Sequence, residues 1–309
     1  MTADLAVSIV SYRTPDLLWR CLSELEGQRQ ELELQVIVVD NASDDGSVEL
    51  VEHEFPRVRV LRNRTNVGFG AAHNQALRQA DARHFLVLNS DAAPGRGALP
   101  TLVAYLDANP GVAVVGPKLR YPDGTVQPSR RRFPTVPTFF FESTQLQRVW
   151  PDNAILRRYY VADRDDDTEQ DVDWLVGACL CVRARAAAEV GLFDERFFMY
   201  SEEIDWCRRF RQAGWRVVYL PSAEVMHQEG ASSGLDLAHR DRQFQKSKLQ
   251  YAAKWHGVRV ARALRSYLVL EYAMRGVEEA VKLAIGSRVA ERRARLRVIG
   301  SGMRHALRG

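Results

Sequence analysis

Three carboxylates crowd the first turn of a predicted helix in the second half of the chain. Glu202, Glu203 and Asp205 follow an aromatic run that extends from Phe197 to Tyr200. Like charges held this close raise one another's pKa, and a carboxylate whose pKa is raised toward neutrality can accept a proton from a substrate hydroxyl. The stretch is therefore a candidate general-base site. The alternative is an acidic helix start that the helix dipole stabilises.

Further polar groups stand where apolar runs of the chain end. They are Ser11, Tyr12, Asp40, Asn89, Ser90 and Asp91. A carboxylate such as Asp40 can bind a ribose hydroxyl or the edge of a base. Asp91 could hold a divalent cation against a diphosphate, with His227 as a second ligand. A capping turn at Asp40 and a structural histidine at position 227 are the alternatives.

The elements that must position these groups follow from the hydrophobic pattern. Short β-branched apolar runs alternate with amphipathic stretches in the first half of the chain. Strands are predicted at 6–10, 35–39, 58–61, 84–88 and 112–115, and helices near 15–27, 47–55, 70–80 and 97–109. This alternation predicts an α/β fold with a mostly parallel sheet covered on both faces, whose ligand lies at the carboxyl ends of the strands.

A glycine-containing helix entry lies between the third and fourth predicted strands. The run from Asn66 to Asn74 includes Gly68 and Gly70 and is suited to exposing backbone N–H groups to an anion. It lacks the third glycine of the dinucleotide fingerprint G-x-G-x-x-G. A hydride-transfer enzyme is therefore disfavoured.

The second half of the chain is less regular. A hairpin with a Pro-Asp-Gly turn is predicted over 117–126. The segment 128–173 has no clear period; it starts with the basic run 130–132 and ends in an acidic stretch, 163–173, that we expect to be a solvated, mobile loop. A strand near 174–183, a helix over about 202–213 and strands near 216–220 and 223–227 complete the globular part.

Charge is distributed unevenly along the chain. The net charge is +4, yet residues 259–309 carry 12 Lys and Arg against 4 Asp and Glu, so an acidic body precedes a basic tail. Apolar residues recur among these arginines at helical spacing, which predicts an amphipathic helix on a membrane or on a partner subunit. We expect an anionic membrane surface as the partner of the tail, and no nucleic acid.

The composition also bears on the compartment. No apolar run approaches the roughly 20 residues that span a bilayer, and the start of the chain lacks a secretory pattern. The four cysteines show neither zinc spacing nor a disulfide framework. We therefore expect a cytoplasmic protein whose cysteines are reduced core residues.

Taken in order, these motifs resemble glycosyltransferase family 2, the inverting enzymes with the GT-A fold. Within the family the chain looks most like bacterial rhamnosyltransferases that act on polyprenyl-diphosphate-linked acceptors. The resemblance covers roughly residues 5–256 and rests on Asp40, Asn66-Val67-Gly68, Asn89-Ser90-Asp91, Gly177-Ala178, Glu202-Glu203-Ile204-Asp205 and His227.

The resemblance implies a donor site and a metal. The donor-binding residues would be Ser11, Tyr12, Asp40, Asn66, Gly68, Asn89, Ser90 and Asp91. The triplet 89–91 occupies the place of the family's metal-binding Asp-x-Asp, where Asn89 replaces the first aspartate and leaves Asp91 as the main carboxylate. His227 falls where relatives bind the same metal, Mg²⁺ or Mn²⁺.

The resemblance also implies a catalytic and an acceptor site. Glu203 takes the base role where many relatives have Glu-Asp, and the choice between Glu202 and Glu203 stays open; Asp205 belongs to the same catalytic motif. The acceptor would meet Trp174, Gly177, Ala178 and Arg130, whose guanidinium could bind a lipid diphosphate. A solvated loop is the alternative for the arginine run.

These expectations define domains and partners. A GT-A domain over 1–257 would comprise a nucleotide-binding half, 1–116, and an acceptor-binding half, 117–257, followed by a basic helical tail, 258–309. The donor would be a dTDP- or UDP-sugar, most simply dTDP-rhamnose, and the acceptor a polyprenyl-diphosphate-linked saccharide. The enzyme would act in cell-wall or surface polysaccharide synthesis at the inner face of the plasma membrane, and a second copy of the chain, in a homo-oligomer, is a further candidate partner.

Three other functions compete with this one. A nucleotidyltransferase needs an early glycine-rich, basic loop, which the segment 11–15 does not offer. A non-catalytic sugar-nucleotide-binding or scaffold protein would bind a donor without turnover. A family 2 transferase that uses a UDP-hexose would share every motif, because none of them decides between thymine and uracil.

Overall fold

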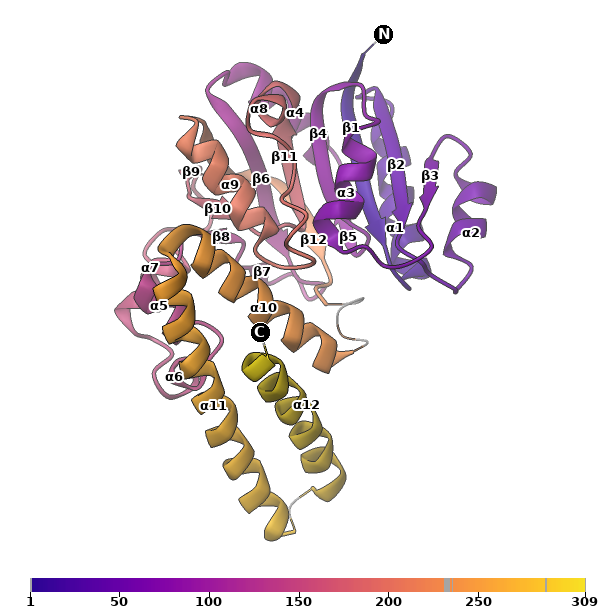
Figure 1. Ribbon diagram of the computed structural model, residues 1–309. Coiled ribbons are helices and arrows are strands. Elements are labelled where there is room, and N and C mark those ends of the chain that lie inside the picture. Colours follow the sequence, from indigo (N-terminus) through magenta and orange to yellow (C-terminus); the bar gives the residue numbers. More distant parts are fainter. Residues whose placement is uncertain (1, 231–233, 235, 287, 309) are drawn as a thin grey trace. The chain divides into compact units, whose positions relative to one another are not determined.

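The computed structural model describes residues 2–230, 234, 236–286 and 288–308. These form two compact units, which Figure 1 shows as ribbons. The sheet unit comprises 1–133, 160–198 and 202–232, and the helical unit comprises 134–159, 199–201 and 233–309. This division differs from the predicted boundary at residue 257, because 134–159 and the residues after 232 group with the C-terminal helices.

The sheet unit is built on one mixed sheet. Its strand order is β3-β2-β1-β4-β11-β6-β12-β5. The strands are β1 Ala3–Ser11, β2 Leu34–Asp40, β3 Arg59–Arg62, β4 Ala82–Asn89, β5 Ala92–Pro94, β6 Val112–Arg120, β11 Cys179–Arg183 and β12 Arg216–His227. β3, β2, β1 and β4 are parallel, as are β6 and β12, whereas β11 runs antiparallel between β4 and β6. The predicted mostly parallel α/β sheet is confirmed.

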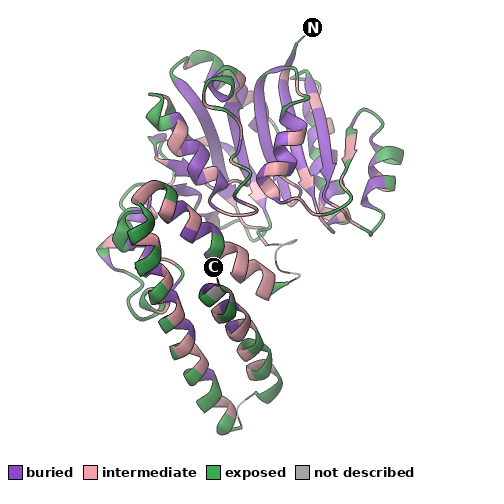
Figure 2. Ribbon diagram, viewed as in Figure 1, coloured by how far each residue is buried: buried purple, intermediate pink, exposed green. Residues whose placement is uncertain are grey.

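Helices cover both faces of this sheet because its strands are apolar on both sides. On one face Leu22 of α1 (Pro15–Gln28) and Leu102 of α4 (Ala98–Ala108) are buried with the strands. On the other face Ala72 and Ala76 of α3 (Phe69–Leu77) pack against Ile37 of β2. Figure 2 shows the central strands as a buried layer, with the edge strand β3 less buried.

The remaining elements of the sheet unit are short. They are α2 Ser47–Glu54, β7 Val126–Gln127, β8 Arg130–Arg131, β9 Gln170–Asp171, β10 Trp174–Leu175, α8 Ala184–Val190 and α9 Glu202–Gln212. β7 pairs with β6 in the predicted hairpin, β9 pairs with β12, and β8 pairs with β10. The predicted strand at 174–183 is split into β10 and β11, and the two predicted strands 216–220 and 223–227 are one strand with a register shift between Leu220 and Glu224.

The acidic stretch is an exposed loop of turns and bends, as predicted. The sequence did not predict its ion pairs: Asp163 lies 2.9 Å from Arg132, Asp171 lies 2.9 Å from Arg216, and Asp167 pairs with Lys118. Val161 and Val172 at its ends are buried. These pairs could not be foreseen because the basic partners are far away in the sequence and only the fold brings them close.

The helical unit contains six described helices. They are α5 Val136–Phe141, α6 Gln145–Val149, α7 Ala154–Tyr159, α10 Leu237–His256, α11 Val258–Ala284 and α12 Val289–Arg308. The predicted amphipathic tail is therefore a helical hairpin of α11 and α12, in which Tyr272 packs against Ile299 and Ala306. Among the helices described, none is long and apolar enough to cross a membrane. All four cysteines are buried thiols.

Candidate active site

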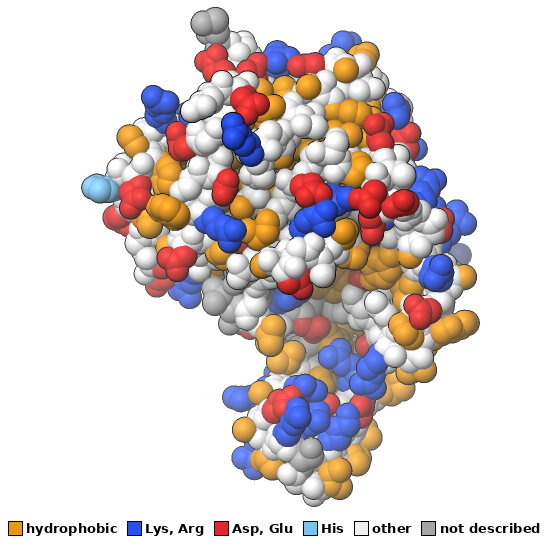
Figure 3. Space-filling model, turned by 180° about the vertical axis from the view of Figure 1, so that it is seen from behind, with side chains coloured by type: hydrophobic (Ala, Val, Ile, Leu, Met, Phe, Trp, Pro, Cys, Tyr) orange, Lys and Arg blue, Asp and Glu red, His pale blue; other side chains and the backbone are white. Residues whose placement is uncertain are grey.

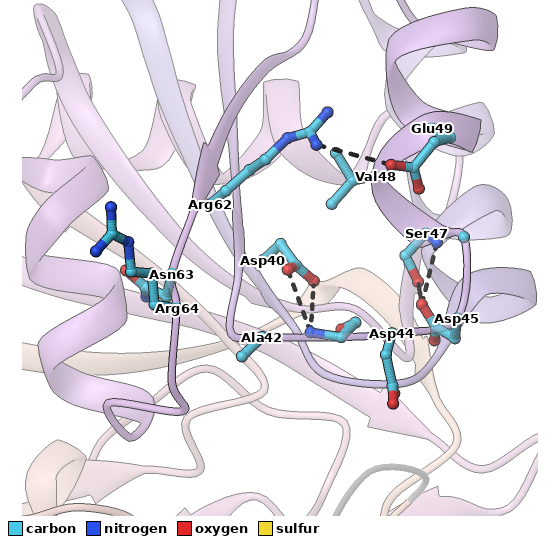
Figure 4. A pocket seen from close by; sticks show the side chains of 12 residues that line it. Asp40, Ala42, Asp44, Asp45, Ser47, Val48, Glu49, Arg62, Asn63 and Arg64 are labelled. Carbon is cyan, nitrogen blue, oxygen red and sulfur yellow. Dashed lines mark hydrogen bonds and ion pairs between the residues drawn. The ribbon is translucent and has the colours of Figure 1, made fainter.

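The carboxyl ends of β2 and β3, the turn after β2 and the start of α2 line a cleft of about 460 Å³. Figure 4 shows Asp40 at its centre, with Asp44, Asp45 and Ser47 on one side and Arg62 and Arg64 on the strand side. The Asp40 carboxylate is buried and accepts a hydrogen bond from the backbone N–H of Ser43, at 3.2 Å to Oδ2. This turn holds the carboxylate at the edge of the sheet, where the sequence places a nucleoside.

Ser11 and Tyr12 line the adjoining end of β1. The Ser11 hydroxyl is fully buried and begins a chain through Thr14 to Ser90, with oxygen separations of 3.5 and 3.0 Å. Tyr12 is half-buried, with the Arg13 guanidinium 5.3 Å from its ring centre. The chain of hydroxyls connects the ends of β1 and β4, so two predicted donor-binding segments meet.

Asn41 is a residue that sequence reasoning missed. Its Nδ2 donates to Oδ1 of Asn66 at 2.8 Å, and its Oδ1 accepts from the backbone N–H of Val67 at 3.0 Å. Asn66 in turn accepts from the N–H of Gly68 at 2.9 Å. Asn41 thus fastens the 63–68 loop to the end of β2. The signal that could have found it is an amide side chain directly after a strand-ending aspartate.

Gly68 joins the donor loop to the segment before the acidic helix. Its φ is +90°, and a Cβ at this position would lie 2.3 Å from the carbonyl oxygen of Phe198. The neighbouring N–H of Phe69 donates to that same oxygen at 2.7 Å. Only glycine allows this approach, since any side chain would overlap a backbone atom.

Asp91 and His227 are brought together as predicted. β5 pairs with β12 so that Ala92 is opposite His227, and Asp91 Oδ1 lies 3.2 Å from Nε2 of His227. Asn89 Nδ2 is 3.1 Å from the same nitrogen. Both side chains of the Asp91–His227 pair are more than nine-tenths buried.

A second layer orients the imidazole. Gln127 donates from Nε2 to Glu229 at 2.7 Å, so its Oε1 faces Nδ1 of His227 at 2.8 Å and accepts the proton there. The lone pair of Nε2 then points toward the Asn89 and Asp91 side. Gln127 was not foreseen, because it lies in the short strand β7, far from β12 in the sequence.

These groups suit a divalent cation. Asn89 Oδ1 is buried and has no hydrogen-bond partner among the residues that the structure describes. An amide oxygen, a carboxylate and an imidazole nitrogen are ligands that Mn²⁺ or Mg²⁺ can use. Within the described ranges no cluster of three or more His, Cys, Asp or Glu side chains could hold a metal alone. The remaining ligands would come from a diphosphate and water, as Mg²⁺ sites commonly arrange.

Glu202 and Glu203 begin α9 in different surroundings. Glu202 is buried, its Cβ 3.6 Å from where a Cβ on Gly70 would lie. Burial, and then the charge of Glu203, raise the pKa of Glu202 well above its ordinary value. Glu203 is half-buried, and a Cβ on Gly177 would lie 3.7 Å from its Cβ and Cγ. The pair therefore combines a buried carboxyl group of raised pKa with a more accessible one.

Asp205 has surroundings unlike those of the two glutamates, and its catalytic role stays a prediction. It is fully buried, and its Oδ2 lies 3.0 Å from Nε of Arg209. Arg209 also donates to the carbonyl oxygens of Val190 and Leu192. One turn separates Asp205 and Arg209 on α9, so the carboxylate orients an arginine that joins the helix to the preceding loop.

The predicted acceptor residues divide into two groups. Gly177 lies beside Glu203, and the carbonyl oxygen of Ala178 accepts from the N–H of Asn89 at 2.9 Å, so this short segment links the two carboxylate groups. Trp174 and Ala178 are buried, however, and the Trp174 indole N–H donates to the carbonyl oxygen of Arg132. Their side chains do not line an open acceptor surface.

Arg130 is held by the acidic stretch. It is buried, pairs with Asp166, donates to the carbonyl oxygen of Asp165 at 2.8 Å and lies 4.9 Å from the ring centre of Tyr219. Its role as an acceptor-binding residue stays a prediction.

A mixed α/β sheet with carboxylates at its strand ends, opposite a buried acidic helix start, defines a glycosyltransferase of the GT-A type. Solved structures support the fold. A mannosyltransferase from Pyrobaculum calidifontis, solved with GDP-Man and Mn²⁺, matches 99% of this chain and 87% of its own with a TM-score of 0.57 at 16% identity. GalNAc-T7 with UDP, GalNAc and Mn²⁺ matches 82% of this chain and 48% of its own with a TM-score of 0.59 at 13% identity.

Sequence comparison gives the family. Residues 6–164 match the model of glycosyl transferase family 2. The chain is 34% identical over 296 residues to N-acetylglucosaminyl-diphospho-decaprenol L-rhamnosyltransferase of Mycobacterium tuberculosis, covering 89% of this chain and 95% of that protein. It is 25% identical to the rhamnosyltransferase WbbL of Escherichia coli over 81% of this chain and 88% of that one. The chain belongs to glycosyl transferase family 2.

Proposed function

We propose that this protein transfers L-rhamnose from dTDP-rhamnose to a polyprenyl-diphosphate-linked N-acetylglucosamine acceptor in cell-wall or surface polysaccharide synthesis. The observation that carries the proposal is the 34% identity to a transferase whose name states that acceptor class, over nearly the full length of both chains. The similarity to WbbL supports the same donor sugar.

The donor is assigned to the carboxyl edge of the sheet. Its nucleoside would occupy the cleft at Asp40, and its diphosphate would lie by Asn89, Asp91 and His227. These three side chains would hold a divalent cation, which when bound neutralises the charge that develops on the leaving diphosphate. The Asn41 network would keep the 63–68 loop closed over the sugar nucleotide.

Glu203 is assigned as the base that takes the proton of the acceptor hydroxyl. It is the more accessible carboxylate of the pair, and Gly177 leaves room beside it. The raised pKa of Glu202 favours its protonated form, which removes a like charge from beside Glu203. Attack by the deprotonated hydroxyl from the side opposite the diphosphate inverts the anomeric carbon.

The basic tail is assigned to the membrane. A polyprenyl-linked acceptor resides in a bilayer, and residues 259–309 carry 12 Lys and Arg against 4 Asp and Glu, a surplus of positive charge. Each Lys or Arg near an anionic surface contributes about 1 kcal/mol to binding. We place the protein at the inner face of the plasma membrane as a peripheral protein.

The test is transfer from a panel of dTDP- and UDP-sugars to a short polyprenyl-diphosphate-N-acetylglucosamine, with Mg²⁺, with Mn²⁺ and with chelator. We expect product from dTDP-rhamnose that disappears with chelator. Product from a UDP-hexose and none from dTDP-rhamnose would show that the donor is a UDP-hexose. Donor binding without turnover from any sugar would favour a binding protein.

A further inference from the structure

Helix α11 carries two separate apolar faces. The inner face, Leu264, Leu268 and Tyr272, is buried within the helical unit. The second face consists of Leu270, Met274, Val277, Val281 and Ile285, whose exposed fractions range from 48% to 74%. Their spacing of three and four residues places them on one side of the helix. We call these five residues the outer stripe.

The outer stripe does not serve the packing of α11 within the helical unit. The inner face already supplies contacts with α12 through Tyr272, and none of the five stripe residues belongs to that cluster. The stripe extends over four turns, about 22 Å at 1.5 Å per residue. A contiguous exposed apolar surface of this length marks an interaction site.

Helix α6 and the residue after it extend this surface. Leu146, Val149 and Trp150 are exposed, with Val149 at 77% and Trp150 at 61%. Arg148 on the same helix lies 3.0 Å from Glu278 of α11, which holds α6 alongside the stripe. Trp150 contacts Phe141 edge to face, so its indole is held on an exposed segment. Tryptophan at such a border is typical of membrane interfaces.

Positive charge stands at both ends of the stripe. Arg259 and Arg262 are exposed before it, and Arg288 is 74% exposed after it. Glu278, at the border of the stripe, is neutralised by Arg148 and Lys282. Apolar side chains with arginines at both ends match an anionic bilayer surface, into which the aliphatic groups insert while the guanidinium groups reach the phosphates.

A second copy of the chain fits this charge pattern less well. Parallel pairing of two outer stripes would bring Arg259 and Arg262 against their own copies. Antiparallel pairing would bring them toward Arg288, which is also positive. Like charges would therefore meet in either orientation, whereas anionic lipids would neutralise both ends.

We propose that the outer stripe of α11, continued by Val149 and Trp150, is the face that inserts into an anionic membrane surface. This inference rests on the proposed function, because the lipid-linked acceptor gives the contact its purpose. It separates the inserting residues from Leu264, Leu268 and Tyr272, which hold the helical unit together.

The test uses vesicles that contain no acceptor, so it does not depend on catalysis. Full-length protein is sedimented with phosphatidylcholine vesicles with and without phosphatidylglycerol. The variant carries Val277→Ser, Val281→Ser and Ile285→Ser. The matched control carries Leu237→Ser and Val258→Ser, two equally exposed apolar residues outside the stripe. Circular dichroism and transfer to a short, water-soluble acceptor confirm that each protein is folded.

We expect the parent and the control to bind phosphatidylglycerol vesicles and the stripe variant to bind at least about tenfold more weakly. Equal binding of all three proteins would overturn the proposal. A concentration-dependent dimer that the stripe variant alone loses would also overturn it and assign the stripe to a second copy. If the parent binds these vesicles but transfers no sugar to the acceptor, the result contradicts the proposed function and still supports the outer stripe as the membrane-inserting face.

Discussion

At the scale of single residues, the site pairs two adjacent carboxyl groups in unlike environments. Glu202 is buried beside Gly70, whereas Glu203 is partly accessible beside Gly177. Burial raises the pKa of Glu202 and favours its protonated form, so we assign the more accessible Glu203 as the base.

Substituting each glutamate in turn distinguishes their roles. Glu203→Gln should lower turnover by about 10²–10⁴-fold while donor affinity stays similar, because only proton removal is lost. Glu202→Gln should lose far less, since an amide resembles a protonated carboxyl group. Turnover and nucleotide titration measure both effects. Near-full activity of Glu203→Gln, with loss in Glu202→Gln, would exchange the two assignments.

The raised pKa of Glu202 predicts how stability depends on pH. The folded state keeps the proton above the ordinary pKa of 4.5, whereas the unfolded chain releases it, so the cost to folding grows as pH rises beyond that value. Glu202→Gln removes this cost. The melting temperature of the variant should rise relative to the parent between about pH 4.5 and 8. A difference independent of pH would show that burial does not hold Glu202 protonated.

At the scale of elements, the donor loop depends on a glycine. Gly68→Ala should destabilise the fold and impair transfer, because the new Cβ would overlap the carbonyl oxygen of Phe198. Gly257 is the matched control: its φ of +91° and ψ of 158° are close to the +90° and 172° of Gly68, yet nothing lies within 4 Å of its Cβ position. Gly257→Ala should therefore cost only the backbone strain, about 1–3 kcal/mol. Chemical denaturation and transfer assays compare them; equal losses would refute the packing argument.

The elements of the first half could be predicted because each carries its own local signal. Apolar runs of β-branched residues gave the parallel strands, and 3.6-residue periodicity gave the helices between them. The ion pairs of the segment 163–171 could not be foreseen, since Asp171 and Arg216 are brought together only by the pairing of β9 with β12. The short helices α5 to α7 could not be predicted either, because they lack a clear local signal.

The candidate site likewise contains residues that the sequence predicted and features that it could not predict. Strand ends supplied Asp40 and Asp91, and the antiparallel pairing of β5 with β12 places His227 beside Asp91, as the family resemblance implied. Residue type alone could not predict which charged side chains are buried. Arg130 and Asp205 carry charges that suit a site, but in the structure each is buried and forms an ion pair.

At the scale of the whole molecule, an acidic sheet unit is joined to helices that carry a basic surplus. Neutralising Arg259, Arg262, Arg288 and Arg293 by glutamine should weaken binding to anionic vesicles by about 10³-fold, at about 1 kcal/mol for each charge. Cosedimentation at low salt measures the loss. Parent binding should fall as salt rises. If neither salt nor these substitutions changes the affinity for anionic vesicles, charge does not hold the protein to the membrane.

The central claim is rhamnosyl transfer to a lipid-linked acceptor. The most direct measurement is mass spectrometry of a polyprenyl-diphosphate-N-acetylglucosamine after incubation with dTDP-rhamnose, with parent and Glu203→Gln side by side. The account predicts a product heavier by one rhamnosyl group, with matching release of dTDP, from the parent and almost none from the variant. An unmodified acceptor after incubation with active, donor-binding protein would contradict it.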